Sequence, residues 1–409
     1  MAQSLSNFDA ALKDNYGPGL RESINNKSAV WSQVAINDED IQGRQAVWSV
    51  HTARSTATGS RGDLGTLPTA SQQGYSQVRD NLASIYHTIQ VSGPAVHLSK
   101  NDSGSFTRAL ESELRGAEKD LSNDCARQAY NTAVTIGGAL WFGALTGTAS
   151  SAYAAPAFTF GSAAASTIRH FFVGMSVDVI NPTTGAVRGT TTVASINKTT
   201  QVVTLAASVA GAASGDYLAR TGNMALATTW GYEMNGLPHL LSATQVYAAL
   251  DPATIVNWAG NAAGSSTTTI SEVLFDTASE LVETDGDGGE INLFIAEHAQ
   301  RRKLAQQMQA QKRYDGREVT LKAGWKGLQL ERGTLVVDKY CPTTSIFGLN
   351  TSELARFVGL DFTWDDDDNR ILYKDDTTDS IKARYKAYQN LEVTNRNSHV
   401  LITVQAPTF

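Results

Sequence analysis

One long amphipathic stretch, residues 102–138, constrains the fold more than any other feature of this sequence. Its apolar residues recur at steps of three or four, which predicts a helix about 45 Å long with one narrow apolar stripe. The stripe consists of Phe106, Leu110, Leu114, Ala117, Leu121, Cys125, Ala129 and Ala133. We place this helix at residues 103–137, because Ser103 offers an N-cap and Gly137-Gly138 a stop signal. Such a helix is suited to lie across a sheet, although an ordinary bundle helix shows the same pattern.

Composition and charge exclude several classes of function. A chain of 409 residues predicts two or three domains, and 42% hydrophobic with 18% charged residues is ordinary globular usage. The net charge of −7 argues against a surface that grips nucleic acid through its phosphates. Because the chain has only two cysteines, Cys125 and Cys341, and no signal-peptide pattern at its start, we expect it to fold in a reducing cytoplasm.

An uncharged stretch, residues 128–168, resembles the beginning of a membrane span. Its apolar run ends near Leu145 and gives way to Gly, Ser, Thr and Pro, so it falls short of the roughly 20 residues that a spanning helix requires. We therefore expect no membrane association.

The residues before the helix predict an arm followed by a β-ribbon. Residues 1–45 carry too few apolar side chains for a core of their own, so this arm must pack on its own subunit or on another one. Residues 46–54 and 75–92 are β-prone, and the 20 residues between them are rich in Gly, Ser and Thr. We therefore predict a long two-stranded ribbon with a flexible polar tip, within residues 46–95.

The residues after the helix predict an α+β fold. Residues 171–221 contain several short β-prone runs separated by turn signals, which predicts a small all-β module inserted in a larger domain. Residues 222–379 alternate helical and extended signals, as in a mixed α+β domain. Residues 380–409 are β-prone again, and they predict either a hairpin around residues 395–397 or long strands added to an earlier sheet.

No group of residues has the spacing of a catalytic or metal site. The seven histidines show no zinc-ligand spacing, and the pattern Ser195 to Lys198 of some acyl enzymes falls in a predicted β-turn without its partners. A calcium-loop-like run begins at Asp285, but Ala296 stands where a bidentate Glu is needed. The acidic run 365–368 favours a solvated turn over a calcium site. We assign no catalytic, cofactor or metal residue and expect no enzyme.

The order of these parts resembles the major capsid proteins of tailed double-stranded DNA bacteriophages with the Hong Kong 97 fold. Four sequence segments also resemble segments of such proteins: MNGLPHLL, VYAALDPATIVNW, GLQLERGTLVVDKYCP and QAQKRYD. The resemblance covers essentially the whole chain. It implies an N-terminal arm (1–45), an extended loop (46–95), a peripheral domain with a spine helix (96–170), an inserted β module (171–221), an axial domain (222–379) and returning C-terminal strands (380–409).

The resemblance implies a structural protein of the virion. Such subunits assemble as hexamers and pentamers, in the cytoplasm of the host bacterium, into an icosahedral head around the double-stranded DNA genome. Because the arm begins almost at Met1, a separate scaffolding protein is implied, along with a portal protein and an optional decoration protein. Two alternatives stay open, an encapsulin-type nanocompartment shell and, from a different class, a β-rich surface-binding or adhesion protein.

The ribbon is where we expect contacts between subunits. Its tip has few sizeable apolar groups and cannot build a core, so it becomes ordered only by lying over a neighbour. Exposed charged contacts of this kind contribute about 0 to 1 kcal/mol each, repeated over many copies. The candidate subunit-interface residues are Arg54, Arg61, Asp63, Leu64, Leu67 and Arg79.

Overall fold

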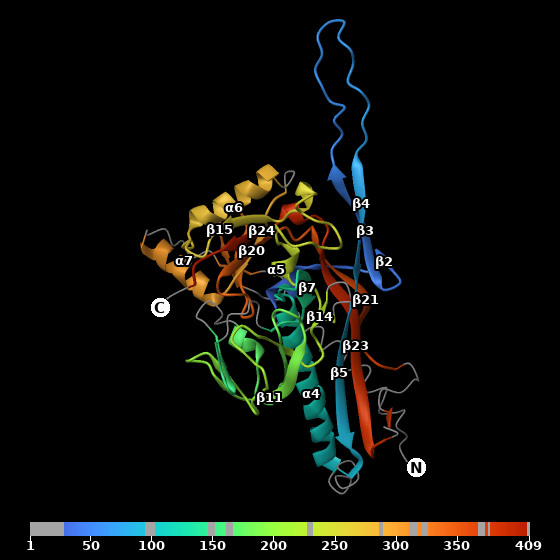
Figure 1. Cartoon of the computed structure of the whole chain (residues 1–409), viewed down its shortest axis with the longest axis vertical. Helices are drawn as coiled ribbons and strands as arrows, with labels where there is room; N and C mark the ends of the chain where they lie inside the picture. The colour runs from blue at the N-terminus through green and yellow to red at the C-terminus, as the bar shows by residue number, and fades with distance from the viewer. Residues whose placement is uncertain are drawn as a thin grey trace.

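The computed structural model describes residues 28–94, 103–145, 152–160, 167–226, 232–285, 289–310, 318–320, 326–366, 373–374 and 377–406. Most of the arm, including residues 1–27, lies outside this set. Strands predominate and helices are few, so the predicted α+β class is confirmed. Figure 1 shows a body of several sheets from which one narrow ribbon projects.

The long helix is α4 (Ser103–Gln128), and it ends nine residues earlier than predicted. Residues 134–136 form a strand, β6 (Val134–Ile136), which pairs antiparallel with β7 (Ala139–Phe142). Strand β7 also pairs with β14 (Ala225–Leu226), so the three strands form one small sheet. Gly137 and Gly138, at φ +58° and +83°, form the tight turn of this hairpin. The predicted stop signal is therefore a strand turn, because Val134, Thr135 and Ile136 are all β-branched and favour extended backbone.

Helix α4 packs along a five-stranded sheet. In this sheet, β5 (Ala83–Ser92) pairs antiparallel with β23 (Ser380–Val393) along the whole length of β5. Strand β23 also pairs with β21 (Leu354–Trp364). The short strands β1 (Ala35–Asn37) and β22 (Tyr373–Lys374) complete the sheet, and α2 (Ala29–Gln33) precedes it. Inward-facing side chains of β5 and β23 meet the apolar stripe of α4 in one core cluster, which includes Ile85, Ile89, Ala117, Leu121, Cys125 and Tyr385. Figure 1 shows α4 running beside β5 and β23.

The ribbon is shorter than predicted. Strand β3 (Gln45–Ala53) pairs with β4 (Gly74–Asn81), and β2 (Ile41–Gln42) adds a third short strand. The prediction that residues 75–92 form one arm of the ribbon is wrong, since the chain bends at Leu82, whose N–H bonds to the carbonyl of Arg44. Beyond this bend β5 leaves the ribbon for β23.

The inserted module is a six-stranded sheet that begins before residue 171. Its strand order is β13 (Tyr217–Arg220), β10 (Ser176–Ile180), β11 (Val187–Asn197), β12 (Val202–Leu205), β9 (Ala157–Thr159) and β8 (Ala152–Ala154). Strands β8 and β9 therefore extend the predicted module toward the N-terminus. The sheet has its own apolar core, which includes Phe158, Val177, Val179, Val203 and Leu218, and η3 (Thr167–His170) adds Ile168 to it.

A seven-stranded mixed sheet forms the rest of the body. Its order is β15 (Asn261–Gly264), β24 (Val400–Thr403), β20 (Ser345–Leu349), β16 (Leu293–Ala296), β19 (Thr334–Val337), β18 (Lys326–Gln329) and β17 (Glu318–Thr320). Figure 1 shows α6 (Glu272–Asp285) and α7 (His298–Ala310) on the outside of this part. Because β23 and β24 lie in different sheets, the C-terminal hairpin is not formed, and its predicted alternative describes the tail.

Short helical turns connect these sheets at the centre of the body. They are α5 (Leu237–Leu240), η4 (Val256–Trp258) and η6 (Arg396–Ser398). Their core cluster contains Leu237, Leu240, Tyr247 and Trp258, together with Tyr130 from the end of α4 and Phe347 from β20. No helix among the described residues is both long and apolar enough to span a membrane.

Candidate subunit-interface surface

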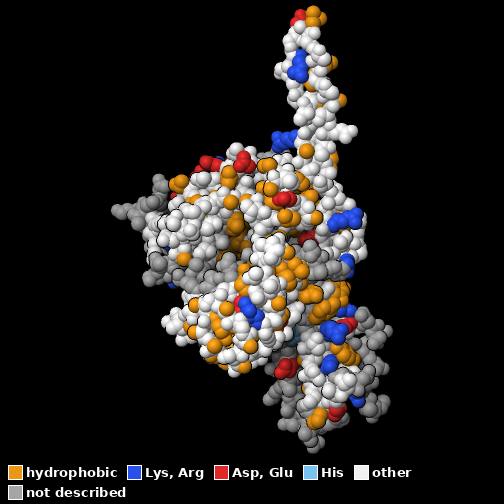
Figure 2. All heavy atoms as spheres, in the orientation of Figure 1, with side chains coloured by type: hydrophobic (Ala, Val, Ile, Leu, Met, Phe, Trp, Pro, Cys, Tyr) orange, Lys and Arg blue, Asp and Glu red, His pale blue; other side chains and the backbone are white. Residues whose placement is uncertain are grey.

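The tip of the ribbon, residues 54–73, contains no buried side chain. Leu64 is fully exposed, Leu67 is 80% exposed, and Tyr75 at the start of β4 is 71% exposed. Figure 2 shows hydrophobic, basic and acidic side chains along this projecting segment. Large apolar side chains this exposed on a projection without a core are typical of a surface that becomes covered by another chain.

Polar contacts shape the tip from within. Arg61 donates from Nε to the carbonyl of Thr66 at 2.8 Å and from Nη1 to that of Ser60 at 2.9 Å. Lower down, the Oγ of Ser55 donates to the carbonyl of Ser71 at 3.1 Å. These bonds are exposed and local, so they shape the tip without attaching it to the body.

The predicted interface residues fall into two groups. Arg61, Asp63, Leu64 and Leu67 gather at the tip, and all four are exposed. Arg54 lies just beyond the end of β3, and Arg79 lies on β4, where it donates to the Oε1 of Gln77 at 2.8 and 3.1 Å. Both are exposed, and they lie apart from these four residues along the ribbon. Their role in subunit contacts stays a prediction.

The base of the ribbon, in contrast, is anchored in the body. Val50 of β3 and Val78 of β4 belong to the central core cluster. The Trp48 ring stacks on Phe357 of β21 with centroids 5.4 Å apart, and it lies 6.5 Å from the Tyr247 ring. The base of the ribbon is therefore fixed to the body, whereas the tip makes no core contact with it.

A buried polar network also joins the ribbon base to the body. The side-chain nitrogen of Asn235 donates to Oδ2 of Asp80 at 2.7 Å and lies 3.5 Å from Oε2 of Glu392. The Tyr247 hydroxyl donates to the same Glu392 oxygen. Asn390 completes the link, donating to the carbonyl of Asn81 at 2.9 Å and accepting from the backbone N–H of Asn235 at 2.9 Å.

Sequence reasoning missed this network. Burial raises the pKa of Asp80, against the effect of its hydrogen bonds from Asn235 and Asn81. Burial, together with the nearby charge of Asp80, raises the pKa of Glu392 well above its usual value. The only local signal is a carboxylate within a β-prone run, LEVT, and that pattern also describes a strand with one solvated face.

A second buried network lies at the end of α4. Arg127 pairs with Asp124 at 3.0 Å and with Glu233 at 2.7 Å, and Asn131 and Asn223 also donate to Glu233. Burial acts to raise the pKa of Asp124, but the guanidinium groups of Arg127 and Arg220 hold it below its usual value. Because each buried charge has an opposite partner, this network fastens α4 to the segment after β14.

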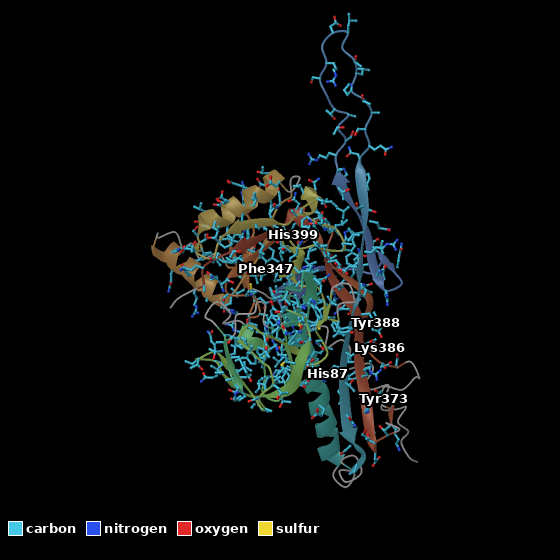
Figure 3. All side chains as sticks on the ribbon, viewed as in Figure 1. His87, Phe347, Tyr373, Lys386, Tyr388 and His399 are labelled. Atoms are coloured by element: carbon cyan, nitrogen blue, oxygen red, sulfur yellow. The ribbon has the colours of Figure 1, made fainter. Side chains whose placement is uncertain are left out.

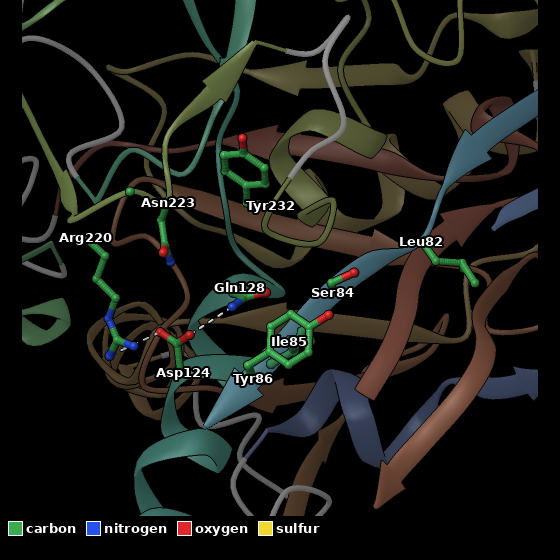
Figure 4. Close-up of a pocket in the computed structure, with 10 residues that line it drawn as sticks. Leu82, Ser84, Ile85, Tyr86, Asp124, Gln128, Arg220, Asn223 and Tyr232 are labelled. Carbon is green, nitrogen blue, oxygen red and sulfur yellow. Dashed lines mark hydrogen bonds and ion pairs between the residues drawn. The ribbon is translucent and has the colours of Figure 1, made fainter. Parts of the chain in front are cut away.

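A cavity of about 550 Å³ lies beside this network, between β5 and the end of α4. Figure 4 shows Gln128 and Arg220 both directed to Asp124 at one side of it. Tyr86 and Tyr232, both about half exposed, also line it. The Arg220 guanidinium lies over the ring of the exposed Phe172 at 5.8 Å.

Several other buried titratable groups have shifted pKa values. Burial lowers the pKa of His170, His239 and His399 to about 4, so these imidazoles are neutral at pH 7. Figure 3 places His399 within the body near Phe347, away from His87 on β5 and Tyr388 on β23. Cys125 and Cys341 are buried free thiols, and burial raises both of their pKa values. Within the described ranges, no three His, Cys, Asp or Glu side chains are placed to hold a metal ion.

Comparison with solved structures gives the class of the fold. The chain is similar to the subunit in the capsid asymmetric unit of cyanophage A-1(L), with a TM-score of 0.56 at 11% identity, over 94% of this chain and 93% of that one. The expected resemblance to phage capsid proteins is therefore confirmed at the level of the fold.

Two further solved shells have lower TM-scores. The capsid of the Myoviridae phage XM1 gives a TM-score of 0.45 at 6% identity, over 92% and 91% of the two chains. The encapsulin complex from Synechococcus elongatus gives 0.44 at 8% identity, over 92% and 87%. No family model and no curated protein sequence matches the chain.

Proposed function

We propose that this chain is the major capsid protein of a tailed double-stranded DNA bacteriophage, a non-enzymatic subunit that assembles into the icosahedral head of the virion. The observation that carries the proposal is the shared fold with a cyanophage capsid subunit over nearly the whole length of both chains. The ribbon supports it independently, because its tip has no buried side chain and yet exposes Leu64 and Leu67.

Each part of the fold then has an expected place in the shell. The ribbon of β3 and β4 serves as the extended loop, α4 as the spine helix, and the seven-stranded sheet with α6 and α7 as the axial domain. The six-stranded module is an insertion beside the peripheral domain. Hexamers and pentamers of the subunit enclose the genome, and a scaffolding protein, a portal protein and an optional decoration protein are the further partners.

The negative charge suits this role. At a net charge of −7 the wall does not hold packaged DNA tightly, because basic side chains are what bind phosphates and release counterions. The subunit then lies beside DNA without sequence-specific contact, which leaves the genome free to enter and leave.

The test is assembly of the purified chain, with and without the genes that neighbour its own. Light scattering and electron microscopy should show rings of five and six subunits and closed icosahedral shells. A strict monomer or dimer at every concentration, even with scaffold present, would contradict the proposal. Shells that enclose a protein cargo and never DNA would support the encapsulin alternative instead.

A pair of double variants tests the role of the tip leucines. Leu64→Asp with Leu67→Asp removes both exposed apolar side chains, and we expect loss of closed shells with an unchanged subunit melting temperature. Thr58→Asp with Thr69→Asp is the matched control, since it adds the same two charges to exposed positions of the same tip and keeps both leucines. Equal assembly of the two double variants would show that the leucines are not contact residues.

A further inference from the structure

Two carboxyl groups meet where the ribbon joins the body. Asp80 lies near the end of β4, Glu392 lies on β23, and both approach the same side-chain nitrogen of Asn235. Glu392 is completely buried and Asp80 is half-buried. Neither group forms an ion pair with any of the described residues, which is unusual because buried carboxylates are normally paired with a cation.

The nearby charged and titratable groups do not neutralise this pair. The Tyr247 hydroxyl donates to Glu392, and burial raises the Tyr247 pKa, so the phenol keeps its proton. The Arg396 guanidinium lies 5.4 Å from the centre of the Tyr247 ring, but it donates to the backbone carbonyls of four other residues: His239, Leu240, Ser242 and Gln245. His239 meets the Tyr247 ring edge-on, and burial keeps its imidazole neutral at pH 7.

We propose that Asp80 and Glu392 hold one proton between them at neutral pH, and that this proton keeps the base of the ribbon attached to the body. Two adjacent carboxylates without a cation repel each other, and one shared proton removes that repulsion. The inference concerns the single subunit, and it does not rest on shell assembly.

The hydrogen bonds assign the proton to Glu392. Asp80 accepts two bonds, from Asn235 at 2.7 Å and from the backbone N–H of Asn81 at 2.7 Å, and such bonds stabilise the charged form of a carboxylate. Glu392 receives its donors on Oε2 alone, while its buried Oε1 has no hydrogen-bond partner. A charge on Glu392 would therefore leave one carboxylate oxygen both buried and without a donor.

The position of the pair makes the ribbon base sensitive to pH. The folded state holds the Glu392 proton more tightly than the unfolded chain does. Its contribution to stability is therefore full below the ordinary carboxyl pKa, and it is lost as the pH rises through the folded value. Tyr247 also lies beside Trp48 of the ribbon. Repulsion between the two carboxylates therefore acts on the contacts that hold the ribbon base against the body. We expect the ribbon base to loosen as the pH increases.

Glu392→Gln tests the shared proton, because Gln has nearly the same shape and is neutral at every pH. Chemical denaturation of the subunit is measured from pH 5 to pH 9 for parent and variant. Relative to the variant, the unfolding equilibrium constant of the parent should rise by up to tenfold per pH unit until Glu392 ionises. Glu280→Gln, at an exposed position on α6, is the matched control and should give a difference that does not change with pH.

A spectroscopic measurement covers the case in which the variant is poorly folded. The infrared spectrum of the parent at neutral pH should contain the carbonyl band of a protonated carboxylic acid, which moves to the carboxylate position at high pH. Absence of that band at neutral pH would overturn the proposal. A parent that gains stability from Mg²⁺ or Ca²⁺ while Glu392→Gln does not would also overturn it, since the pair would then hold a cation.

Hydrogen exchange tests the connection to the ribbon. With increasing pH, amides in β3 and β4 of the parent should lose protection relative to Glu392→Gln, while the amides of α6 and β16 should not. A loss of protection spread equally over both regions would refute the local role of the proton.

Discussion

Shortening the ribbon tip should leave the subunit folded and abolish its assembly. The change replaces residues 56–73 with a four-residue Gly-Ser turn between Ser55 and Gly74. No side chain in the replaced segment is buried, and its hydrogen bonds, such as those of Arg61 to Ser60 and Thr66, are exposed. The body therefore loses no core contact.

The expected stability change is small. Shortening the closed loop from 18 residues to four is about two halvings of its length, which is worth roughly 1.2 kcal/mol in loop-closure entropy. The lost hydrogen bonds act in the opposite direction, but water replaces each exposed bond, so the two effects are of similar size. For a chain of this size the net effect corresponds to a shift in melting temperature on the order of 1–2 °C.

Two measurements are needed, one on the subunit and one on the shell. Calorimetry gives the melting temperature of the subunit, and electron microscopy with heat challenge gives the yield and the resistance of closed shells. The control is Trp48→Ala at the ribbon base, which removes the stacking on Phe357 and should destabilise the subunit by about 2–3 kcal/mol.

Either of two outcomes would refute this reasoning. If the shortened chain forms shells as resistant as those of the parent, the tip is not a subunit contact. If the shortened subunit unfolds, the segment belongs to a core that the structure does not show.

The remaining predictions concern stability. Arg396→Met should cost about 3–5 kcal/mol in chemical denaturation because four backbone carbonyls lose their buried donor, while Arg384→Met, at an exposed ion pair with Asp365, should cost under about 1 kcal/mol. Residues 152–226 expressed alone should give a β-type circular dichroism spectrum and a cooperative melt, whereas residues 171–221 should not, because they lack β8 and β9. Acidification from about pH 6.5 toward pH 4 should lower the urea midpoint of unfolding. In this range histidines bind protons in the unfolded chain, whereas three buried imidazoles with lowered pKa values stay neutral in the folded chain: His170, His239 and His399.

Local pattern was enough to predict several elements. The apolar spacing of residues 103–128 depends only on the 3.6-residue period of a helix, and that helix is present. The low apolar content of the ribbon tip already excluded a core there.

The partners of each element could not be predicted in the same way. The run 75–92 has the alternation of one strand, yet β4 pairs with β3 while β5 pairs with β23, nearly 300 residues later. Alternation states which face of a strand is apolar, and it carries no information about which strand lies beside it. For the same reason, the sequence did not predict that β8 and β9 belong to the sheet of the inserted module.

The sequence by itself determined the α+β class, the long helix and the uncovered ribbon tip. Each of these follows from short-range periodicity or from composition. Only the tertiary structure decided how the ribbon is anchored and that Asp80 meets Glu392 at its base. Those features arise from contacts between residues hundreds of positions apart, and their energies depend on burial and distance, which no local pattern encodes.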